Sequence, residues 1–416
     1  MNTPASADTL PASEATFPPA AHFFGLAPFL RMSIAGIDFT AHTQEMIAKA
    51  QDNPDDAMLW MNLSTAMMSL KHEELGLTIQ DQALAQQRIY VRPAAIQPAK
   101  LRLLMLVVPG NLSANVPLDC LLENSDVDLI YYFVDPHGAE PLAWAIPEHD
   151  LTMVAIGASD DTRELIVRLE HKLTDWPTPV INAPQYVFSA ERNTASLLLQ
   201  NVPGLQISPA LHITRTELAE VAAGNLMLSD VVAGHQFPII LRPVGTHGGH
   251  GLQKLDTPAE VATYLAEMNE TVFFLSQFID YSGDDGQFRK YRVVLIDGKP
   301  YACHMGISSH WMIHYVNAGM YEDAAKRAEE AVFLNNFAEF AERHKAALDA
   351  IYQRTGLDYL GIDCAETKDG QFLVFEIDPA MVIHAMDDDV LFPNKQIPMR
   401  KVTDAFRNLL LARVNS

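Results

Sequence analysis

The stretch Tyr359–Pro379, YLGIDCAETKDGQFLVFEIDP, has the pattern of a β-hairpin. Two runs rich in β-branched and aromatic residues flank Asp369 and Gly370, and an Asp-Gly pair between such runs is the strongest short hairpin signal. With these two residues as the loop, counting outward places Asp363 opposite Glu376. Two carboxylates that face each other on neighbouring strands repel, so an ordinary hairpin avoids this pair. The facing acids therefore call for a partner of opposite charge.

One face of this hairpin is predicted to be acidic and the other apolar. Asp378 lies two residues beyond Glu376, so it shares the face of Glu376 and Asp363. The opposite face carries apolar side chains, namely Ile362, Cys364, Phe375 and Ile377. Three carboxylates without a cation among them suit a hard divalent ion, because Mg²⁺ takes oxygen ligands and is commonly held by one or two carboxylates with substrate phosphates. The alternative is a solvated polar face with a repulsive pair.

Composition excludes several classes of protein. The chain has 416 residues, of which 49% are hydrophobic and 19% charged, so it is globular and long enough for two or three domains. No apolar run reaches the roughly 18 residues of a membrane span, and the N-terminus lacks the basic and apolar regions of a secretory signal. Three cysteines without CxxC spacing favour a reducing compartment, so we expect a cytoplasmic protein.

The net charge of −23 bears on the partners of the chain. A nucleic-acid-binding protein needs a basic stripe, and none is visible, so we expect neither nucleic acid nor a membrane as a partner. An anionic ligand would have to be received by a local cluster of cations against the overall negative field.

The N-terminal region is predicted to be an arm followed by helices. Residues 1–20 are rich in Pro, Ala, Ser and Thr without periodicity, which is typical of a disordered arm. Residues 21–97 are largely helical in pattern, and 57–91 resemble one tetratricopeptide repeat with a helix pair at Asp56–Leu70 and Glu73–Tyr90. A generic helical hairpin is the favoured alternative, because one repeat cannot bury its own face.

Residues 98–185 alternate between predicted strands and helices, after a linker expected at Arg92–Pro98. Strands are expected at Leu101–Val108, Val127–Val134, Leu151–Gly157 and Thr178–Ile181, with helices at 116–124 and Thr162–Leu173. Such alternation predicts a small parallel sheet with flanking helices. The sequence has no GxGxxG motif here, so no dinucleotide site is inferred, and this domain is expected to lend one wall to a substrate cleft.

A glycine-rich loop follows the predicted strand Phe237–Arg242. The sequence PVGTHGGHGL places four glycines within seven residues: Gly245, Gly248, Gly249 and Gly251. Glycines tolerate positive φ and expose backbone N–H groups, so such a loop can close over phosphates. The guanidinium of Arg242 could hold a phosphate in fork geometry. This is not a Walker A loop, because no Gly-Lys-Ser/Thr follows, and a flexible hairpin loop is the alternative.

Two further cations lie on a later strand. Period-two alternation in the strand Arg289–Ile296 places Lys290 and Arg292 on one face. A solvated strand face is the alternative to a ligand site. A long amphipathic helix at Phe333–Gln353 is expected to lead to the carboxylate hairpin, and a helix at Thr403–Val414 to close the chain.

The order of motifs from 189 to 383 resembles the ATP-grasp superfamily, nearest to its RimK-type peptide ligases and D-alanine–D-alanine ligases. SAERNTASLLL resembles the family's helix-opening segment, FPIILRP the strand with a phosphate-binding Lys, and PVGTHGGHGL the flap over the β- and γ-phosphates. FFLSQFI resembles the interdomain hinge, and the carboxylate hairpin resembles the magnesium triad. The likeness implies an α/β fold of α+β type. Two α+β subdomains within 186–416 would clasp ATP, preceded by the parallel-sheet domain and the helical region.

The resemblance also implies roles for individual residues. Arg242 and Arg292 would be catalytic, with Arg292 facing the reacting phosphoryl group, and Arg192 would bind phosphate. The implied cofactor-binding set is Arg192, Arg242, Gly245, Thr246, His247, Gly248, Gly249, Gln277, Phe278, Ile279 and Asp284, of which the hinge residues meet adenine and Asp284 or its neighbour Asp285 the ribose. The implied metal ligands are Asp363, Glu376 and Asp378, which would hold two Mg²⁺ ions, with Mn²⁺ as the alternative.

Several positions depart from the family pattern. Arg192 and Arg242 replace the two usual lysines, and Asp378 stands where the family has Asn, so negative charge is added at the triad. The segment DPAMVIHAMDDD, which contains His384, follows the triad in place of a glycine, so the acceptor side is expected to be atypical. Acceptor contacts are expected at Ser308, Ser309, His310 and Asn317. Histidines near the motifs are expected to pack or hydrogen-bond rather than act as bases: His247, His250, His304, His310, His314 and His384.

The implied activity is that of an ADP-forming carboxylate–amine ligase. A substrate carboxylate attacks the γ-phosphate of ATP to give an acyl phosphate, and an amine then displaces phosphate to form an amide. Small-molecule or peptide carboxylates and amines are the expected substrates, and ligases of this type are often homodimers. Three alternatives stay open: a peptide-modifying or macrocyclising ligase, an ATP-binding regulatory protein without turnover, and a phosphotransferase that forms no amide.

Overall fold

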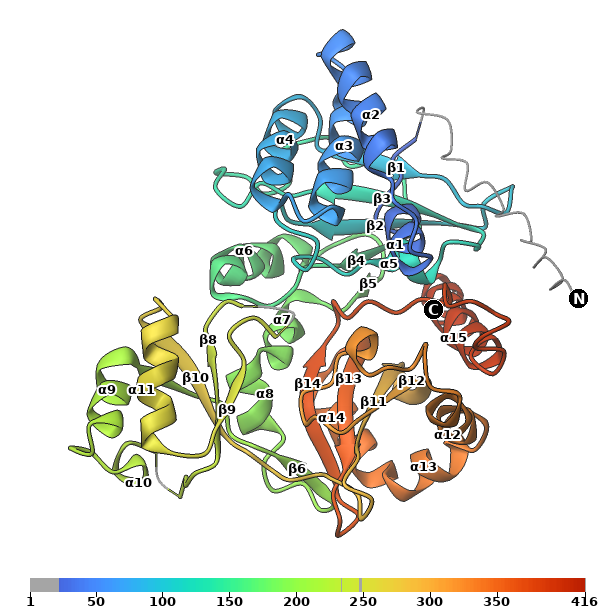
Figure 1. Cartoon of the computed structure of the whole chain (residues 1–416). Helices are drawn as coiled ribbons and strands as arrows, with labels where there is room; N and C mark the ends of the chain where they lie inside the picture. Colours follow the sequence, from blue (N-terminus) through green and yellow to red (C-terminus); the bar gives the residue numbers. More distant parts are fainter. Residues whose placement is uncertain (1–21, 233, 247–248, 416) are drawn as a thin grey trace, which may run out of the picture. The chain divides into compact units, whose positions relative to one another are not determined.

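Two units make up the chain, and each buries its own apolar core. The structure, a computed structural model shown in Figure 1, describes residues 22–232, 234–246 and 249–415. The arm expected at 1–20 lies outside the described residues. The units are Met1–Gln87 and Arg88–Ser416. Within the described ranges, no helix combines the length and the apolar character that crossing a bilayer requires.

The described part of the N-terminal unit is helical. Its helices are α1 Ala27–Ile34, α2 Thr40–Asp52, α3 Ala57–Ser69 and α4 Glu73–Gln86. α3 and α4 approach closely because Gly76 has no side chain: a Cβ there would lie 2.4 Å from Cγ of Met68. Across the same contact, the Ser64 hydroxyl donates to the Gly76 carbonyl oxygen at 2.8 Å. The expected helix pair is confirmed, but its second helix ends at Gln86 rather than at Tyr90.

Tyr90 lies in a strand of the second unit instead. β1, Ile89–Arg92, pairs antiparallel with β3, Val127–Phe133. Tyr90 is fully buried, and its ring meets that of Phe133 edge-on with centroids 5.8 Å apart. The sequence IYVR is compatible with either a helix end or a strand. Pairing with the distant strand β3 stabilises the strand. The expected linker Arg92–Pro98 therefore begins inside an edge strand.

The first sheet of the second unit is mostly parallel, as the alternating pattern predicts. Its order is β1-β3-β2-β4-β5, with β2 at Leu101–Val107, β4 at Leu151–Val154 and β5 at Val180–Ile181. Helices accompany the crossovers: α5 Leu118–Leu121, α6 Arg163–Leu173 and, after β5, α7 Pro184–Val187. β3 lies on one side of β2 and β4 on the other, so the strand order reverses between β2 and β4.

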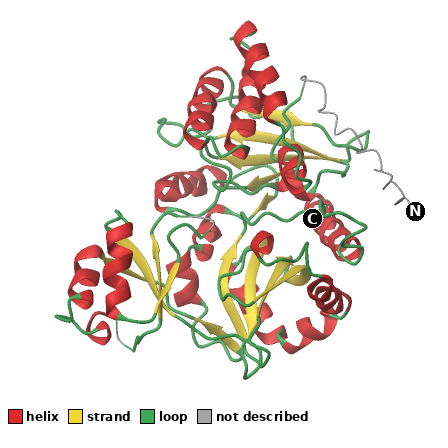
Figure 2. Ribbon diagram, viewed as in Figure 1, coloured by secondary structure: helices red, strands yellow, loops and turns green. Residues whose placement is uncertain are grey.

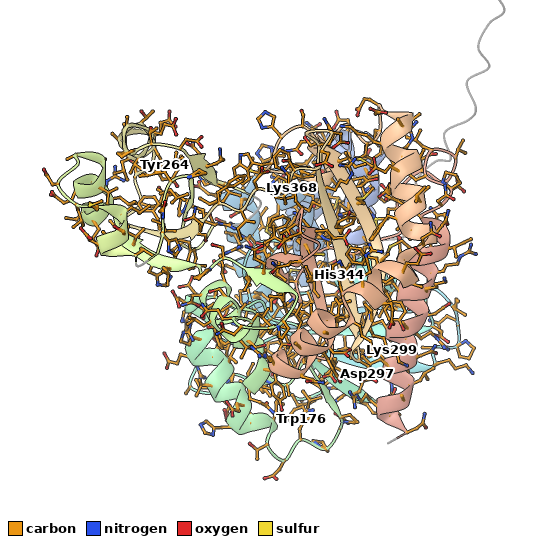
Figure 3. All side chains as sticks on the ribbon, turned by 90° about the horizontal axis from the view of Figure 1, so that it is seen from below. Trp176, Tyr264, Asp297, Lys299, His344 and Lys368 are labelled. Atoms are coloured by element: carbon orange, nitrogen blue, oxygen red, sulfur yellow. The ribbon has the colours of Figure 1, made fainter. Side chains whose placement is uncertain are left out.

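An antiparallel sheet of order β7-β10-β8-β9 follows. Its strands are β7 Leu211–Thr214, β8 Ile239–Pro243, β9 Gln253–Leu255 and β10 Val272–Gln277. α9 Arg215–Ala222 and α11 Pro258–Glu267 lie on one face of it in Figure 1, and α10 is Leu228–Val231. Tyr264 of α11, labelled in Figure 3, packs its ring on Phe273 and donates its hydroxyl to the Gly251 carbonyl oxygen at 2.8 Å. That bond fixes the end of the glycine-rich loop.

A larger sheet, of order β12-β11-β13-β14-β6, carries the hairpin. Its strands are β6 Leu205–Ile207, β11 Phe288–Ile296, β12 Lys299–Ser308, β13 Tyr359–Glu366 and β14 Phe372–Asp378. Neighbouring strands are antiparallel except for β6, which joins β14 parallel. Figure 2 shows this sheet in yellow with helices packed beside it. The expected fold class is thus confirmed: a parallel-sheet domain precedes two α+β subdomains.

The single long helix expected at Phe333–Gln353 is wrong. Three helices occupy the region: α12 Ala324–Asn335, α13 Phe337–Arg343 and α14 Lys345–Thr355. The breaks between them let Phe333 and Phe340 both pack on Tyr291, with ring centroids 4.8 and 5.0 Å away. Apolar spacing continues through the breaks, so the helical period alone does not show them.

The hairpin pairs as predicted at its base but not at its tip. β13 and β14 place Asp363 opposite Glu376. Near the tip Glu366 pairs with Phe372, so the loop is 367–371 and longer than the predicted two residues. A β-bulge directly after Asp363 then shifts the register by one residue and restores the predicted pairing. The two departures cancel, so the acidic pair forms as expected.

Asn182, which follows β5, joins the parallel sheet to β13. Its side chain donates to the Tyr359 carbonyl oxygen at 2.9 Å and accepts from the Tyr359 N–H at 3.0 Å. Its own N–H donates to the Asp358 carboxylate at 2.9 Å. The C-terminal helix α15, Gln396–Val414, strengthens the connection, because its Arg407 pairs with Asp126 before β3 at 2.5 Å.

We expect Asn182→Ala to lower the free energy of unfolding by about 3 kcal/mol, because the N–H and C=O of Tyr359 would be buried without partners. Asn201→Ala is the matched control: Asn201 is exposed and shares the positive φ of Asn182 (58° and 50°), so it loses only the backbone preference of Asn. Urea denaturation of the full chain measures both variants. Equal losses would contradict a role for the side-chain hydrogen bonds.

Candidate functional site

A cavity of about 370 Å³ lies between the four-stranded sheet and the sheet that carries the hairpin, β12-β11-β13-β14-β6. Residues of β8, β10, β11, β13 and β14 line it, together with α8, Arg192–Leu198. Part of the lining is apolar, and part is charged: Arg192, Arg242, Lys290, Arg292, Asp363, Glu376 and Asp378. The fold therefore brings the three predicted arginines and the three predicted carboxylates to one cavity.

Asp363 on β13 is a buried acid that two cations neutralise. Its side chain is 4% exposed. Arg292 binds both carboxylate oxygens, through Nε at 2.8 Å and Nη2 at 2.9 Å, and Nζ of Lys290 lies 2.6 Å from Oδ2. Burial opposes ionisation, but these cations outweigh it and hold the pKa of Asp363 well below its usual range. Lys290 and Arg292 thus share one face and one partner, as the alternation predicts.

A second ion pair joins α8 to β14. Nη2 of Arg192 lies 2.5 Å from Oε1 of Glu376. Burial disfavours the charged form of Glu376, yet Arg192 leaves its pKa below the ordinary value. Asp378 forms no ion pair within the described part of the chain, and its Oδ1 accepts from the Ala380 N–H at 2.7 Å. Burial, followed by repulsion from Glu376, raises the pKa of Asp378 to about 7.

Arg242 on β8 is a buried cation without a carboxylate partner among the described residues. It is 8% exposed, and its guanidinium donates to the carbonyl oxygen of Thr246 in the glycine-rich loop. Burial, followed by repulsion from Arg192, lowers the pKa of Arg242 to about 10. Two guanidinium groups that repel each other in a buried place are stabilised when an anion with several oxygens bridges them.

The hinge residues Gln277, Phe278 and Ile279 line the same cavity. The Phe278 ring meets that of Trp311 edge-on, with centroids 5.8 Å apart. The Gln277 side chain is used inside the protein, since its Nε2 donates to the Pro238 carbonyl oxygen at 2.8 Å. The remaining apolar lining offers a flat aromatic ligand a surface to stack on.

Other predicted residues lie apart from this cavity or at its edge. Gly249 lines it, and Gly245 and Thr246 line a second cavity. His247 and Gly248 fall outside the described residues. Of the residues that the structure describes, several predicted positions line neither cavity: Asp284, Ser308, Ser309, His310, Asn317 and His384. Asp285, the alternative ribose contact, pairs with Arg289 at 2.7 Å.

The second cavity measures about 530 Å³ and opens at the loops that follow β2 and β4. These loops supply 108–111, 113–114 and 157–162. The cavity shares Arg192, Glu376 and Asp378 with the first one. It lies at the carboxyl ends of parallel strands where the strand order reverses, which is the usual ligand position in such a sheet.

Sequence reasoning missed these loops and the segment 311–313, and it named His314 only as a histidine expected to pack or hydrogen-bond. The loops could have been found, because in the expected parallel sheet the carboxyl ends of the strands meet at one edge. Trp311 and His314 line the first cavity without any motif that marks them. His314 is also in contact with the glycine-rich loop, where a Cβ on Gly249 would lie 2.6 Å from its Nε2. Burial, then repulsion from Lys290, lowers the pKa of His314, which favours its neutral form.

The carboxylates fit a divalent cation only in part. Among the described residues, no group of three or more His, Cys, Asp or Glu side chains is arranged to hold a metal ion. The cations on Asp363 occupy both of its oxygens, so it does not fit as a ligand in this arrangement. Glu376 and Asp378 do fit, since two carboxylates that repel each other suit Mg²⁺, which takes one or two of them with substrate phosphates.

No family model and no curated protein matches the chain. Among solved structures, it is similar to ATP-grasp ligases, as its motifs predict. The VanG D-Ala:D-Ser ligase from Enterococcus faecalis matches with a TM-score of 0.43 and 14% identity over 74% of this chain and 99% of that one. A RimK domain ATP-grasp protein from Sphaerobacter thermophilus gives 0.43 and 15% over 74% and 99%.

The D-alanine–D-alanine ligase from Bacillus anthracis, solved in complex with ATP, gives a TM-score of 0.42 and 13% identity over 73% of this chain and 98% of that one.

Asp378→Asn should stabilise the metal-free protein more at pH 8 than at pH 5. The folded-state pKa of about 7 lies above the ordinary 3.8, so the folded protein binds this proton more tightly and loses stability as the pH rises from 4 through 7. Removing the carboxyl should recover about 2 kcal/mol at pH 8, after allowance for partial exposure. Thermal unfolding in EDTA at several pH values measures this. Asp369→Asn is the control, because the hydrogen bond to Thr367 lowers the pKa of the Asp369 carboxyl. A gain in stability for Asp378→Asn that does not change with pH would contradict the raised pKa of Asp378.

Proposed function

We propose that the chain is an ATP-dependent, ADP-forming carboxylate–amine ligase. The observation that carries this proposal is the cation cluster of the first cavity, where Arg192 of α8 and Arg242 of β8 meet Lys290 and Arg292 of β11. In a chain with a net charge of −23, a local cluster of this kind is what an anionic ligand needs. A triphosphate matches it, because guanidinium groups bind phosphate oxygens in fork geometry.

The rest of the cavity supports a nucleotide. Apolar and aromatic residues of β10, the hinge and 311–313 line it beside the cations. The purine of a nucleotide would stack on this lining, while the phosphates of the nucleotide reach Arg192 and Arg242. The Arg242 guanidinium donates to the Thr246 carbonyl oxygen of the glycine-rich loop. A phosphate that binds this guanidinium would therefore also affect the position of the loop.

In the proposed reaction, a substrate carboxylate oxygen attacks the γ-phosphorus, and the bond to the bridging oxygen breaks to release ADP. An amine then attacks the acyl carbon, phosphate leaves with the electron pair of the C–O bond, and the amine loses a proton. Arg192 and Arg242 would position the phosphates and stabilise the charge that develops on them. Glu376 and Asp378 would hold a divalent cation, which neutralises phosphate charge when bound.

We propose that a substrate occupies the second cavity, which shares Arg192, Glu376 and Asp378 with the first. This places a substrate beside the phosphates without overlap with the nucleotide. The second cavity has further acids in its lining, namely Asp160, Asp161 and Glu191. A substrate that carries a protonated amine fits this lining better than a second polyanion does.

One observation favours a second candidate function, an ATP-binding protein without turnover. Arg292 and Lys290 neutralise Asp363, so only two carboxylates of the expected three fit a metal ion. A nucleotide could then bind without the full set of metal ligands. Turnover separates the two candidates.

We expect purified protein to bind Mg-ATP and to release ADP when a suitable pool of amino acids or dipeptides is added. Arg242→Gln should weaken ATP binding by about 10- to 100-fold, because a charge-assisted contact contributes roughly 1.5–3 kcal/mol. Glu376→Ala should abolish the ADP release. Calorimetry measures the binding, and a coupled assay measures ADP.

Arg343→Gln is the matched control. Arg343 pairs with Glu366 of β13, and it is not among the residues found to line either cavity. It should bind ATP as the wild type does. No ATP binding by the wild type would overturn the nucleotide site. Binding without ADP release in any pool favours the protein without turnover.

A further inference from the structure

The segment 311–317, which follows β12, forms one wall of the first cavity. Trp311 and His314 both line this cavity. The ring of Trp311 packs edge-on against that of Phe278 in the hinge, and His314 contacts the glycine-rich loop at Gly249. The segment therefore brings the sheet that carries the hairpin into contact with the hinge and with the loop that follows β8.

A buried ammonium group lies behind this segment. Lys395, the residue just before α15, is 3% exposed, and its Nζ lies 3.1 Å from Oδ2 of Asp387 and 3.5 Å from Oε1 of Glu330. The same Nζ lies over the rings of Tyr315 and Phe392, 3.7 and 4.5 Å from their centroids. None of the three charged residues is among the described residues that line either cavity, so the proposed reaction does not use them directly.

Hydrogen bonds extend this cluster to the segment and to the chain after β14. Glu330 of α12 accepts from the Tyr315 hydroxyl at 2.9 Å and from a backbone N–H of β12 at 3.0 Å. Asp387, which lies in the chain after β14, accepts from the Tyr321 hydroxyl at 2.8 Å. We call these five residues the Lys395 network: Lys395, Glu330, Asp387, Tyr315 and Tyr321. It connects α12, the segment and the chain that leads to α15.

Other side chains hold the segment near its two ends. Lys290 and Tyr281 donate to backbone carbonyl oxygens near its start, and Lys326 of α12 donates to one just beyond its end. Tyr315 lies between these anchors, and its side chain belongs to the Lys395 network. The network therefore supports the middle of the segment, directly after His314.

A buried network of charges favours one arrangement of its members. Taking an ammonium group and two carboxylates out of water is costly, and well-packed apolar side chains in their place are often at least as stable. Stability alone therefore does not explain the Lys395 network. Any movement of Tyr315 away from Glu330 would leave a buried oxygen without its hydrogen bond, so the network opposes such movement.

We propose that Lys395 is a positioning residue of the candidate site: by holding Tyr315 it keeps Trp311 and His314 against the hinge and the glycine-rich loop, and so preforms the wall that the nucleotide meets. This rests on the proposed function and adds to it a residue from outside the cavity. A wall that is already in place loses less conformational freedom when the ligand binds, which raises the affinity.

The first test needs no ligand. The full chain labelled with fluorotryptophan should give one fluorine NMR signal for each of its four tryptophans, and Trp311→Phe identifies the signal of Trp311. Lys395→Met removes the ammonium group and keeps a long side chain. It should shift or broaden the Trp311 signal and leave the other three unchanged, because only Trp311 lies on the segment.

Arg407→Met is the matched control for this variant. It removes an ion pair of the same helix, α15, since Arg407 pairs with Asp126. Arg407 is not among the described residues that line either cavity. The control should lower the thermal midpoint without a change in the Trp311 signal.

The second test measures Mg-ATP binding by calorimetry, well below the thermal midpoints of all variants. Lys395→Met should weaken this binding by roughly 2- to 30-fold, the range that substitutions within a coupling network reach. Arg407→Met should bind Mg-ATP as the wild type does. A merely structural role for Lys395 would lower the thermal midpoint in both variants and leave both affinities unchanged.

Tyr315→Phe decides if thermal melts show that Lys395→Met does not fold. It removes only the hydroxyl that donates to Glu330, so it should move the Trp311 signal and weaken Mg-ATP binding by a smaller factor. Tyr352→Phe is its control, because it loses a hydroxyl that donates to Asp297 at 3.4 Å. Tyr352 is not among the described residues that line either cavity.

An unchanged Trp311 signal in the folded variant would overturn the proposal, and so would an unchanged affinity for Mg-ATP. Equal shifts of all the tryptophan signals would overturn it too, because they would show a general loosening of the protein. Failure of the proposed function looks different: the wild type would then bind no Mg-ATP. The preformed nucleotide wall would fall with it, while the NMR signal would still decide whether Lys395 positions Trp311.

Discussion

The site depends on the burial of one carboxylate, that of Asp363. Unpaired, this group would be neutral or would destabilise the sheet that carries the hairpin, because a buried charge needs both a partner and hydrogen bonds. Arg292, its cross-strand neighbour, and Lys290 meet that need and connect β11 to β13 through side chains as well as backbone. The strand that carries Glu376 and Asp378, β14, pairs with β13 beside them. The charged lining of the cavity is therefore built into the sheet.

The sequence predicted most of this arrangement from local rules. Period-two alternation is enough to place Lys290 and Arg292 on one face, and Asp363 opposite Glu376 follows from counting pairs. The count succeeded although the turn was wrong, since a bulge after Asp363 compensates for the longer loop. Nothing in the letters marks a bulge. The helix expected at Phe333–Gln353 failed for a related reason: packing on Tyr291 fixes where the helices break, and that contact is remote in the sequence.

Several predicted residues of the first cavity share a simple property: they lie in a regular element whose direction the pattern already gives. Arg192 begins a helix, Arg242 lies near the end of a strand, and Gln277 ends another. Residues that the prediction missed, such as Trp311 and Ser113, lie in loops. Their place depends on how the sheets come together, and single-sequence periodicity does not report it. The wall that the parallel-sheet domain lends to the second cavity was expected, but not the residues that form it.

The bonds of Asn182 have a mechanical consequence. They connect the parallel sheet to β13, and α8 packs on β14 and α14, so Arg192, Glu376 and Asp378 lie on elements that contact one another. The four-stranded sheet, which carries Arg242 and Thr246, is outside this group of elements. A swing of that sheet would change the distance from Arg242 to Glu376 while the distance from Arg192 to Glu376 stayed constant. Such a movement would then change the electrostatic environment of Arg242 and leave that of Arg192 largely as it is.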